Sequence, residues 1–346
     1  MHMADALISP SVGGTMLAAS AGLIAYSSKK LKDEMDDRKI PLMGVMGAFI
    51  FAAQMINFTI PATGSSGHLG GGLILSVILG PYAAFLTIAS VLLVQALFFA
   101  DGGLLALGCN IFNLGFFPCF IIYPFVYKKI MGSTITSGKL TAASVISAVL
   151  GLQLGAFAVV IETVASGISS LPFGTFVLLM QPIHLAIGLV EGLATAAVVL
   201  FIYRAEPEII TENTGSSGER KISFRKAIIT MGVIAVLVGA VMSWFASAYP
   251  DGLEWSMAKT AGVEELDSPG HSIYSSLKSL QEKTAFLPDY NFRTSGEADQ
   301  QEAGPSWPAV DSGTSVAGIV GGIITLALAF AIGFILKRRK VVETDK

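Results

Sequence analysis

Long apolar stretches separated by short polar loops dominate the chain. An apolar run of about 20 residues is long enough to cross the hydrocarbon core of a bilayer as a helix. Such runs lie near residues 5–27, 41–60, 82–100, 105–127, 140–165, 175–203, 227–248 and 314–336. A shorter apolar run at 70–79 is bounded by glycines and by Gly80-Pro81, and could be a re-entrant piece, a short span or a loop. The pattern predicts an all-α integral membrane protein.

The basic residues indicate the orientation. Lys and Arg gather in the cytoplasmic loops of membrane proteins. Basic clusters follow the runs that end at 27, 127, 203 and 336, and another precedes the run that begins at 227. All of them fall on one side only if 70–79 also crosses. We therefore expect nine spanning helices, with the N-terminus outside and the C-terminus in the cytoplasm.

The spans divide the chain into two units. Residues 1–204 hold seven spans with short loops, and 205–226 form a polar cytoplasmic linker. Residues 227–346 hold two spans around an outer loop, 249–313, which has 11 acidic and 4 basic residues. The whole chain is 53% hydrophobic and 14% charged, against about 25% charged in a soluble domain. This composition excludes a soluble enzyme, a disordered chain and a nucleic-acid binder.

Several catalytic motifs are absent. The sequence has no GxxxxGK[ST], HExxH, GxSxG or CxxC, so ATP hydrolysis by a P-loop is excluded. Cys109 and Cys119 lie inside apolar runs and provide no disulfide framework. The clear ionisable residues within the spans are Glu162 and Glu191, fewer than the relay of a proton-coupled carrier needs.

Two outer histidines are candidate metal ligands. The N-terminus lacks the basic flank of a secretory signal, so we expect Met1 and His2 to be retained. The terminal amine, the backbone nitrogen of residue 2 and the His2 imidazole can then form adjacent chelate rings, in a tetragonal or square-planar field that suits Ni(II), Cu(II) or Co(II). His68, in the glycine-rich loop SSGHLGGG, lies on the same outer side. An ordinary second residue and an exposed loop histidine are the alternative interpretation.

Other polar residues within the spans have plainer roles. His184 and Glu191 are seven residues apart, so they share one face of a helix. We favour a buried hydrogen bond or a packing contact for them over a metal role. Asn110 and Asn113 are suited to bonds between helices. We place all four around the metal site or in helix packing rather than among the ligands.

The first span carries a face of small residues. Ala18, Ala21, Gly22 and Ala25 have the spacing that lets helices approach closely. Such a face packs inside a bundle or receives a partner subunit, and the sequence alone favours packing inside the bundle.

Several segments together resemble a known family. Met1-His2-Met3, SSGHLGGGL, GPYAAFL, LVQALFFADGGLLALGCNIFNLGF and HLAIGLVEGLATAAVV resemble the CbiM/NikM substrate-capture subunits of energy-coupling factor transporters. The resemblance covers roughly residues 1–204. PDGLEW, at 250–255, resembles the PDGLE domain, a NikN/CbiN-like accessory part.

The resemblance implies a fold, a ligand set and partners. It implies a seven-helix S-component bundle followed by a two-helix accessory domain with an extracytoplasmic loop. Co(II) or Ni(II) would be bound by the amine of Met1, the backbone and imidazole nitrogens of His2, and the imidazole of His68. The metal would be transported cargo, not a cofactor. The implied partners are a transmembrane coupling subunit (CbiQ/NikQ-like) and two ABC ATPases (CbiO/NikO-like), so the chain itself would not be an enzyme.

The expected location is the inner membrane of a prokaryotic cell. The alternative function is a stand-alone divalent metal channel or a proton-coupled metal carrier. A second alternative, an intramembrane metalloenzyme, would need an open metal position and a general base, and a square-planar four-nitrogen site provides neither. The same nitrogen ligands serve nickel and cobalt, so the sequence does not distinguish the two ions.

Overall fold

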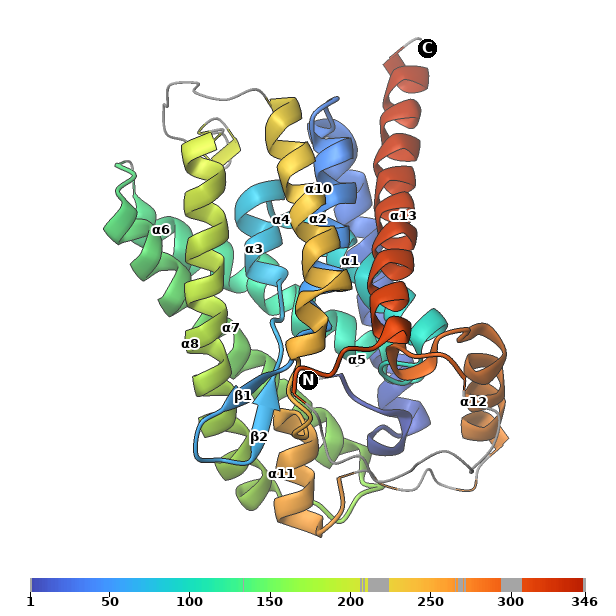
Figure 1. Ribbon diagram of the computed structural model, residues 1–346. Coiled ribbons are helices and arrows are strands. Elements are labelled where there is room, and N and C mark those ends of the chain that lie inside the picture. The colour runs from blue at the N-terminus through green and yellow to red at the C-terminus, as the bar shows by residue number, and fades with distance from the viewer. Residues whose placement is uncertain are drawn as a thin grey trace.

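The chain folds into a mostly helical bundle, seen in the computed structural model of Figure 1. The structure describes residues 2–132, 134–205, 207, 209–210, 224–264, 266, 270, 272–293 and 307–344. The α-helices are α1 (Pro10–Glu34), α2 (Lys39–Gln54), α3 (Gly72–Leu79), α4 (Pro81–Val94), α5 (Leu107–Ile111), α6 (Lys128–Met131), α7 (Ser137–Ser166), α8 (Phe173–Ala205), α10 (Phe224–Ala240), α11 (Gly252–Ala261), α12 (Ser272–Thr284) and α13 (Ser312–Thr344).

Smaller elements complete the fold. Two π-helical segments continue α4 and α5, namely η2 (Gln95–Phe99) and η3 (Phe112–Tyr127). Three short 3-10 turns are η1 (Asp5–Leu7), η4 (Met242–Phe245) and η5 (Pro288–Tyr290). Strands β1 (Phe58–Ile60) and β2 (Ser65–Gly67) form an antiparallel hairpin that pairs Phe58 with Gly67. This hairpin directly precedes His68.

Five helices among the described residues are long and apolar enough to span a membrane. They are Pro81–Phe99, Leu107–Met131, Ser137–Ser166, Phe173–Ala205 and Ser312–Arg338. They correspond to the apolar runs predicted at 82–100, 105–127, 140–165, 175–203 and 314–336. The helical, multi-span character of the chain thus agrees with its hydropathy pattern.

The segment at 70–79, for which the sequence leaves a re-entrant piece, a short span or a loop open, forms a short helix. Its helix, α3, has eight residues, so it is about 12 Å long against the ~30 Å of a hydrocarbon core. An extended stretch leads from β2 into α3, and α3 runs opposite in direction to α2 and α4 (Figure 1). All eight residues of α3 are buried. Non-helical backbone is tolerated at this depth because surrounding protein shields it.

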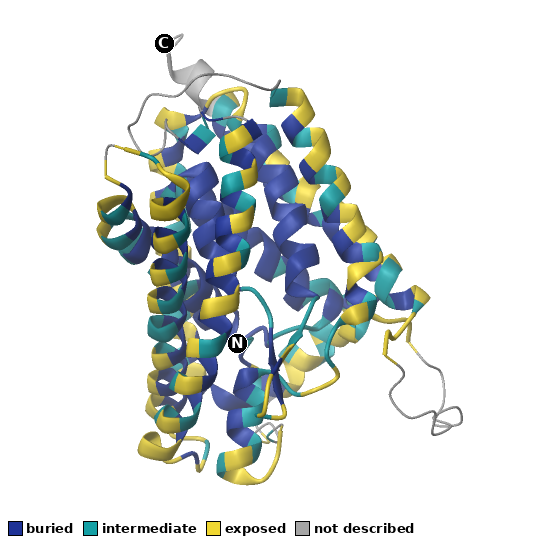
Figure 2. Ribbon diagram, turned by 60° about the vertical axis from the view of Figure 1, so that its left-hand side comes forward, coloured by how far each residue is buried: buried dark blue, intermediate teal, exposed yellow. Residues whose placement is uncertain are grey.

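Helix α2 is deeply buried in the bundle. Nearly all of its residues are buried, and α10 and α13 of the C-terminal part pack against it. Gly47 lies close to Thr325 of α13, and a side chain at Gly321 would collide with Phe51. By contrast, α7 and α8 pack against each other and leave large apolar side chains exposed on their outer faces (Figure 2). That surface suits contact with lipid.

The small-residue face of α1 does not pack inside the bundle. Its members are all exposed: Ala18, Ala21, Gly22 and Ala25. Other residues of α1 make the buried contacts instead. Gly13 lies against Leu105, and the hydroxyl of Ser20 donates to the carbonyl of Gly108 at 2.7 Å. The preference for internal packing was therefore wrong, because small-residue spacing does not tell which side of a helix faces the core.

Candidate metal-binding site

His2 and His68 lie side by side. Their ring centroids are 4.9 Å apart with the planes tilted by 45°. The His2 side chain is 7% exposed, and His68 follows β2 in the loop that leads into α3. Met1 lies outside the described residues. The structure thus brings together the two histidines that the sequence singles out, although they are far apart in the chain.

The N-terminal segment is held by its backbone. Asn110 accepts a hydrogen bond from the Met3 N–H at 2.8 Å and donates one to the Met3 carbonyl at 3.2 Å. Gly103 N–H donates to the same carbonyl at 2.9 Å. Asp5 accepts from the N–H groups of Leu105 and Ala106. Asn110 is therefore a positioning residue, since it fixes the residue next to His2.

A carboxylate that the sequence analysis did not select touches His2. Asp101 Oδ1 lies 2.7 Å from His2 Nδ1, and its Oδ2 accepts a 2.5 Å hydrogen bond from the hydroxyl of Tyr290. Burial raises the pKa of the Asp101 carboxyl, but His2 and the hydrogen bonds from His2 and Tyr290 outweigh burial and bring the pKa to about 2. The only signal in the sequence was a lone acid in the glycine turn between two apolar runs.

Glu191 fixes the backbone just beyond His68. Its carboxylate accepts hydrogen bonds from the N–H groups of Gly70 at 2.9 Å and Gly71 at 3.0 Å. Gly71 has a φ of +78°, which favours glycine, and the Gln54 amide donates to the carbonyl of Gly70. Burial lowers the pKa of His68 to about 3, so its imidazole is neutral and offers a lone pair.

The remaining predicted residues differ in their contacts. Asn113 donates to Glu162 at 2.7 Å, which pairs one of the two buried glutamates of the spans. His184 is completely buried, and its Nδ1 lies 2.8 Å from the carbonyl of Met180. It lines a small cavity together with His68. Asn113 thus has a structural partner, whereas His184 lies beside the site.

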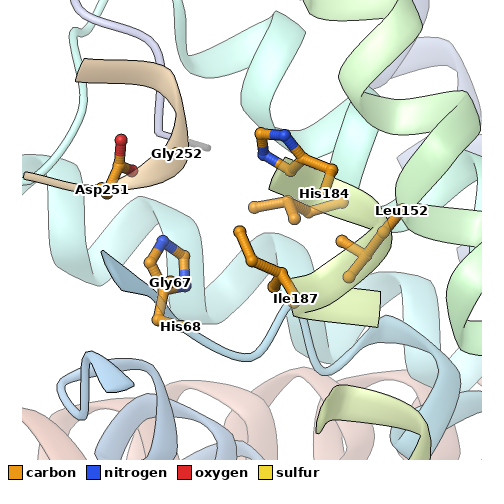
Figure 3. Close-up of a pocket in the computed structure, with 9 residues that line it drawn as sticks. Gly67, His68, Leu152, His184, Ile187, Asp251 and Gly252 are labelled. Atoms are coloured by element: carbon orange, nitrogen blue, oxygen red, sulfur yellow. The ribbon is translucent and has the colours of Figure 1, made fainter. Parts of the chain in front are cut away.

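The C-terminal part covers the His68 hairpin. The carbonyl oxygens of Tyr249 and Pro250 accept hydrogen bonds from the hydroxyl and the N–H of Ser66, at 2.7 and 2.8 Å. Asp251, the next residue, caps α11 by accepting from two of its first N–H groups. Asp251 also lines the cavity of His68 and His184, as Figure 3 shows. The two units that the sequence separates are in close contact here.

An acidic hollow opens in front of His2 and His68. Its volume is about 820 Å³, and it is lined by carboxylates from both units: Asp5, Asp101, Asp251, Glu254 and Asp289. Lys278 is the one Lys or Arg side chain among the described residues that line it. This charge distribution attracts cations. In the described part of the chain no three His, Cys, Asp or Glu side chains converge closely enough to hold a metal ion.

Comparison with known proteins identifies both units. Residues 2–209 match the family model of CbiM, the cobalt uptake substrate-specific transmembrane region, and residues 225–338 match the PDGLE domain. A putative fused nickel transport protein NikMN of Archaeoglobus fulgidus is 35% identical over 343 residues, covering 96% of this chain and 98% of that protein. The fused nickel transport protein NikMN of Rhodobacter capsulatus is 28% identical, covering 84% and 88%.

A solved structure supports the same assignment. The crystal structure of a truncated transition metal transporter is 29% identical, with a TM-score of 0.53. The match covers 59% of this chain and 99% of the other. The chain is thus a multi-pass membrane protein that belongs to the CbiM family of cobalt and nickel transport proteins, fused to a C-terminal PDGLE domain.

Proposed function

We propose that the chain is the substrate-capturing subunit of an ATP-driven energy-coupling factor importer of Co(II) or Ni(II). The observation that carries this proposal is the His2–His68 pair, with ring centroids 4.9 Å apart, next to an acidic hollow. A hydrated divalent cation is drawn into the hollow and exchanges its water for nitrogen ligands. The PDGLE domain supports capture by covering the hairpin that carries His68.

The proposed ligands are four nitrogens: the Met1 amine, the backbone and imidazole nitrogens of His2, and the imidazole of His68. Backbone donors explain how a site can exist where no three acidic, histidine or cysteine side chains converge among the described residues. The chelate ring of His2 closes through Nδ1. Because Nδ1 contacts Asp101 in this structure, loading requires the His2 ring to turn and release that carboxylate.

The energy would come from partner subunits. The sequence has no P-loop, so we assign ATP hydrolysis to two separate CbiO/NikO-like ATPases, with a CbiQ/NikQ-like coupling subunit between them and this chain. The exposed small-residue face of α1 supports such a partner, because it is open to close helix packing. The orientation we propose has the N-terminus outside and the C-terminus in the cytoplasm of a prokaryotic cell.

The test compares the native chain with a chain that carries one extra residue before Met1. The extension keeps both histidines but moves the amine out of the chelate. We expect Ni(II) affinity, measured by calorimetry on the purified full-length chain, to fall at least about 100-fold, or about 2.8 kcal/mol. Unchanged affinity would remove the amine from the ligand set. Uptake in vesicles by this chain without ATPases would instead support a self-sufficient carrier.

A further inference from the structure

His184 has the protonation state of a histidine prepared to bind a metal ion. The carbonyl of Met180 can only accept a hydrogen bond, so the Nδ1 at 2.8 Å from it must carry the proton. The lone pair then lies on Nε2. Metal-binding histidines are commonly held in this way, with the second ring N–H donated to a backbone carbonyl.

The Nε2 atom of His184 is buried and lacks a hydrogen-bond partner within the described part of the chain. Leaving a buried acceptor unsatisfied destabilises the folded chain, so a ligand that binds this atom is favoured. The ring of His184 projects from α8 toward a cavity of about 10 Å³ that His68 and Asp251 line from other elements (Figure 3). The cavity has room for about one water molecule or one ion.

The other groups around the cavity favour a cation. His68 supplies an imidazole, and Asp251 supplies a carboxylate whose Oδ1 caps α11. A second small cavity shares Gly70, Leu114 and Leu152 with the first, and Glu191 is among the residues that line it.

We propose that Nε2 of His184 is an inner binding station for the transported Co(II) or Ni(II). The ion would reach this station from His68, and the Asp251 carboxylate would neutralise part of its charge. The proposal rests on the proposed function, because it assigns the next position of the captured ion. The three side chains do not converge on one point in this structure. The station therefore offers the ion fewer protein ligands and binds more weakly than the four-nitrogen site.

The experiment uses the full-length chain with the extra residue before Met1, so that the inner station is measured without the planar chelate. Co(II) binding is followed by calorimetry and by visible absorption. We expect a residual, weaker Co(II) site. His184→Phe, which fills the same space without a nitrogen, should lower its affinity at least tenfold. The proposal would be overturned if the extended chain had no residual Co(II) site. It would also be overturned if His184→Phe in the extended chain changed the residual affinity by less than twofold.

Two further variants guard against simple misfolding. Ile187→Val alters the wall of the same cavity without removing a donor and should keep the residual affinity. His184→Gln keeps a polar side chain that can donate to Met180 and should still lose the site. Without the extension, His184→Phe and His184→Gln should each bind Ni(II) with an affinity within threefold of that of the native chain. A larger loss in both would place His184 in the first site and overturn the inner station.

The two proposals can fail separately. Should the extension leave Ni(II) affinity unchanged, the four-nitrogen site is wrong, whatever His184 does. Should the extension weaken binding while His184→Phe has no effect on the residual site, the capture site stands and the inner station is wrong.

Discussion

The indole N–H of Trp255 donates to the carbonyl oxygen of Thr63 at 3.0 Å, across 192 positions of the chain. Trp255 belongs to α11 in the PDGLE domain, and Thr63 lies in the turn of the hairpin that carries His68. This bond supplements those between Ser66 and the carbonyls at 249 and 250. The position of a proposed ligand therefore depends on the accessory domain.

Removal of this bond should loosen the hairpin. Trp255→Phe keeps an aromatic ring but loses the donor, at a cost of about 1 kcal/mol, so we expect about fivefold weaker Ni(II) binding. Hydrogen exchange of the backbone at 58–67 should increase. The matched control is Trp244→Phe, which loses a 2.7 Å bond to Ser315 inside the C-terminal part. Equal effects of the two variants on affinity would contradict the assignment.

The two asparagines should behave differently. Asn110→Leu leaves the N–H of Met3 without its side-chain partner, a cost of about 1–3 kcal/mol, and should weaken Ni(II) binding about tenfold or more. Asn113→Leu removes the partner of Glu162 and should lower the melting temperature while keeping Ni(II) affinity within threefold. Calorimetry and thermal unfolding of both variants provide the comparison. A tenfold loss of affinity in Asn113→Leu would show that the two residues act alike.

Replacement of Glu191 should disturb the loop after His68. A glutamine at 191 has one acceptor oxygen for the two N–H groups of Gly70 and Gly71, so one of them loses its partner. We expect Glu191→Gln to cost about 1–3 kcal/mol and to reduce Ni(II) affinity. The same change at Glu162 serves as the control, because Glu162 contacts Asn113 instead. If Glu162→Gln reduces affinity more, the loop is not the reason.

The apo chain should lose stability on acidification. The pKa of His68 is about 3 in the folded chain and about 6.5 when unfolded, so the unfolded state binds the extra proton between these values. The contribution of the neutral His68 to the free energy of unfolding is fully present above pH 6.5 and falls as the pH drops toward 3. At pH 5 the loss is at most about 2 kcal/mol. Melting temperatures at pH 7 and pH 5 should differ less in His68→Phe than in the native chain. An equal difference would mean that other groups cause the acid sensitivity.

Hydropathy and terminal chemistry predicted much of what the structure contains. Apolar length located five helices that are long enough to span a membrane, and His2 and His68 lie side by side. The first prediction follows from the rule that a bilayer requires long apolar helices. The second follows from the local chemistry of the terminus, where a chelate requires His at position 2. The ligand set itself stays a proposal, since Met1 lies outside the described residues.

The contacts that support the two histidines could not be predicted from the sequence. Asp101 and Asp251 are two acids among many in loops, and only the folded chain brings them to His2 and to the cavity of His184. Asn110 and Glu191 contact backbone groups, and the residue types in the sequence do not reveal such contacts, because nearly every residue carries the same backbone groups. The apolar run at 70–79 left a re-entrant piece, a short span or a loop open, and the structure forms the eight-residue helix α3 there.

The burial of α2 by the PDGLE domain has a consequence for assembly. At 16 residues α2 is about 24 Å long, short of the bilayer core, and its neighbours α10 and α13 come from the last third of the chain. Its shielding from lipid is finished only after synthesis of these helices. Fusion into one polypeptide guarantees one copy of the cover for each copy of α2 and presents it at the high effective concentration of a tethered segment.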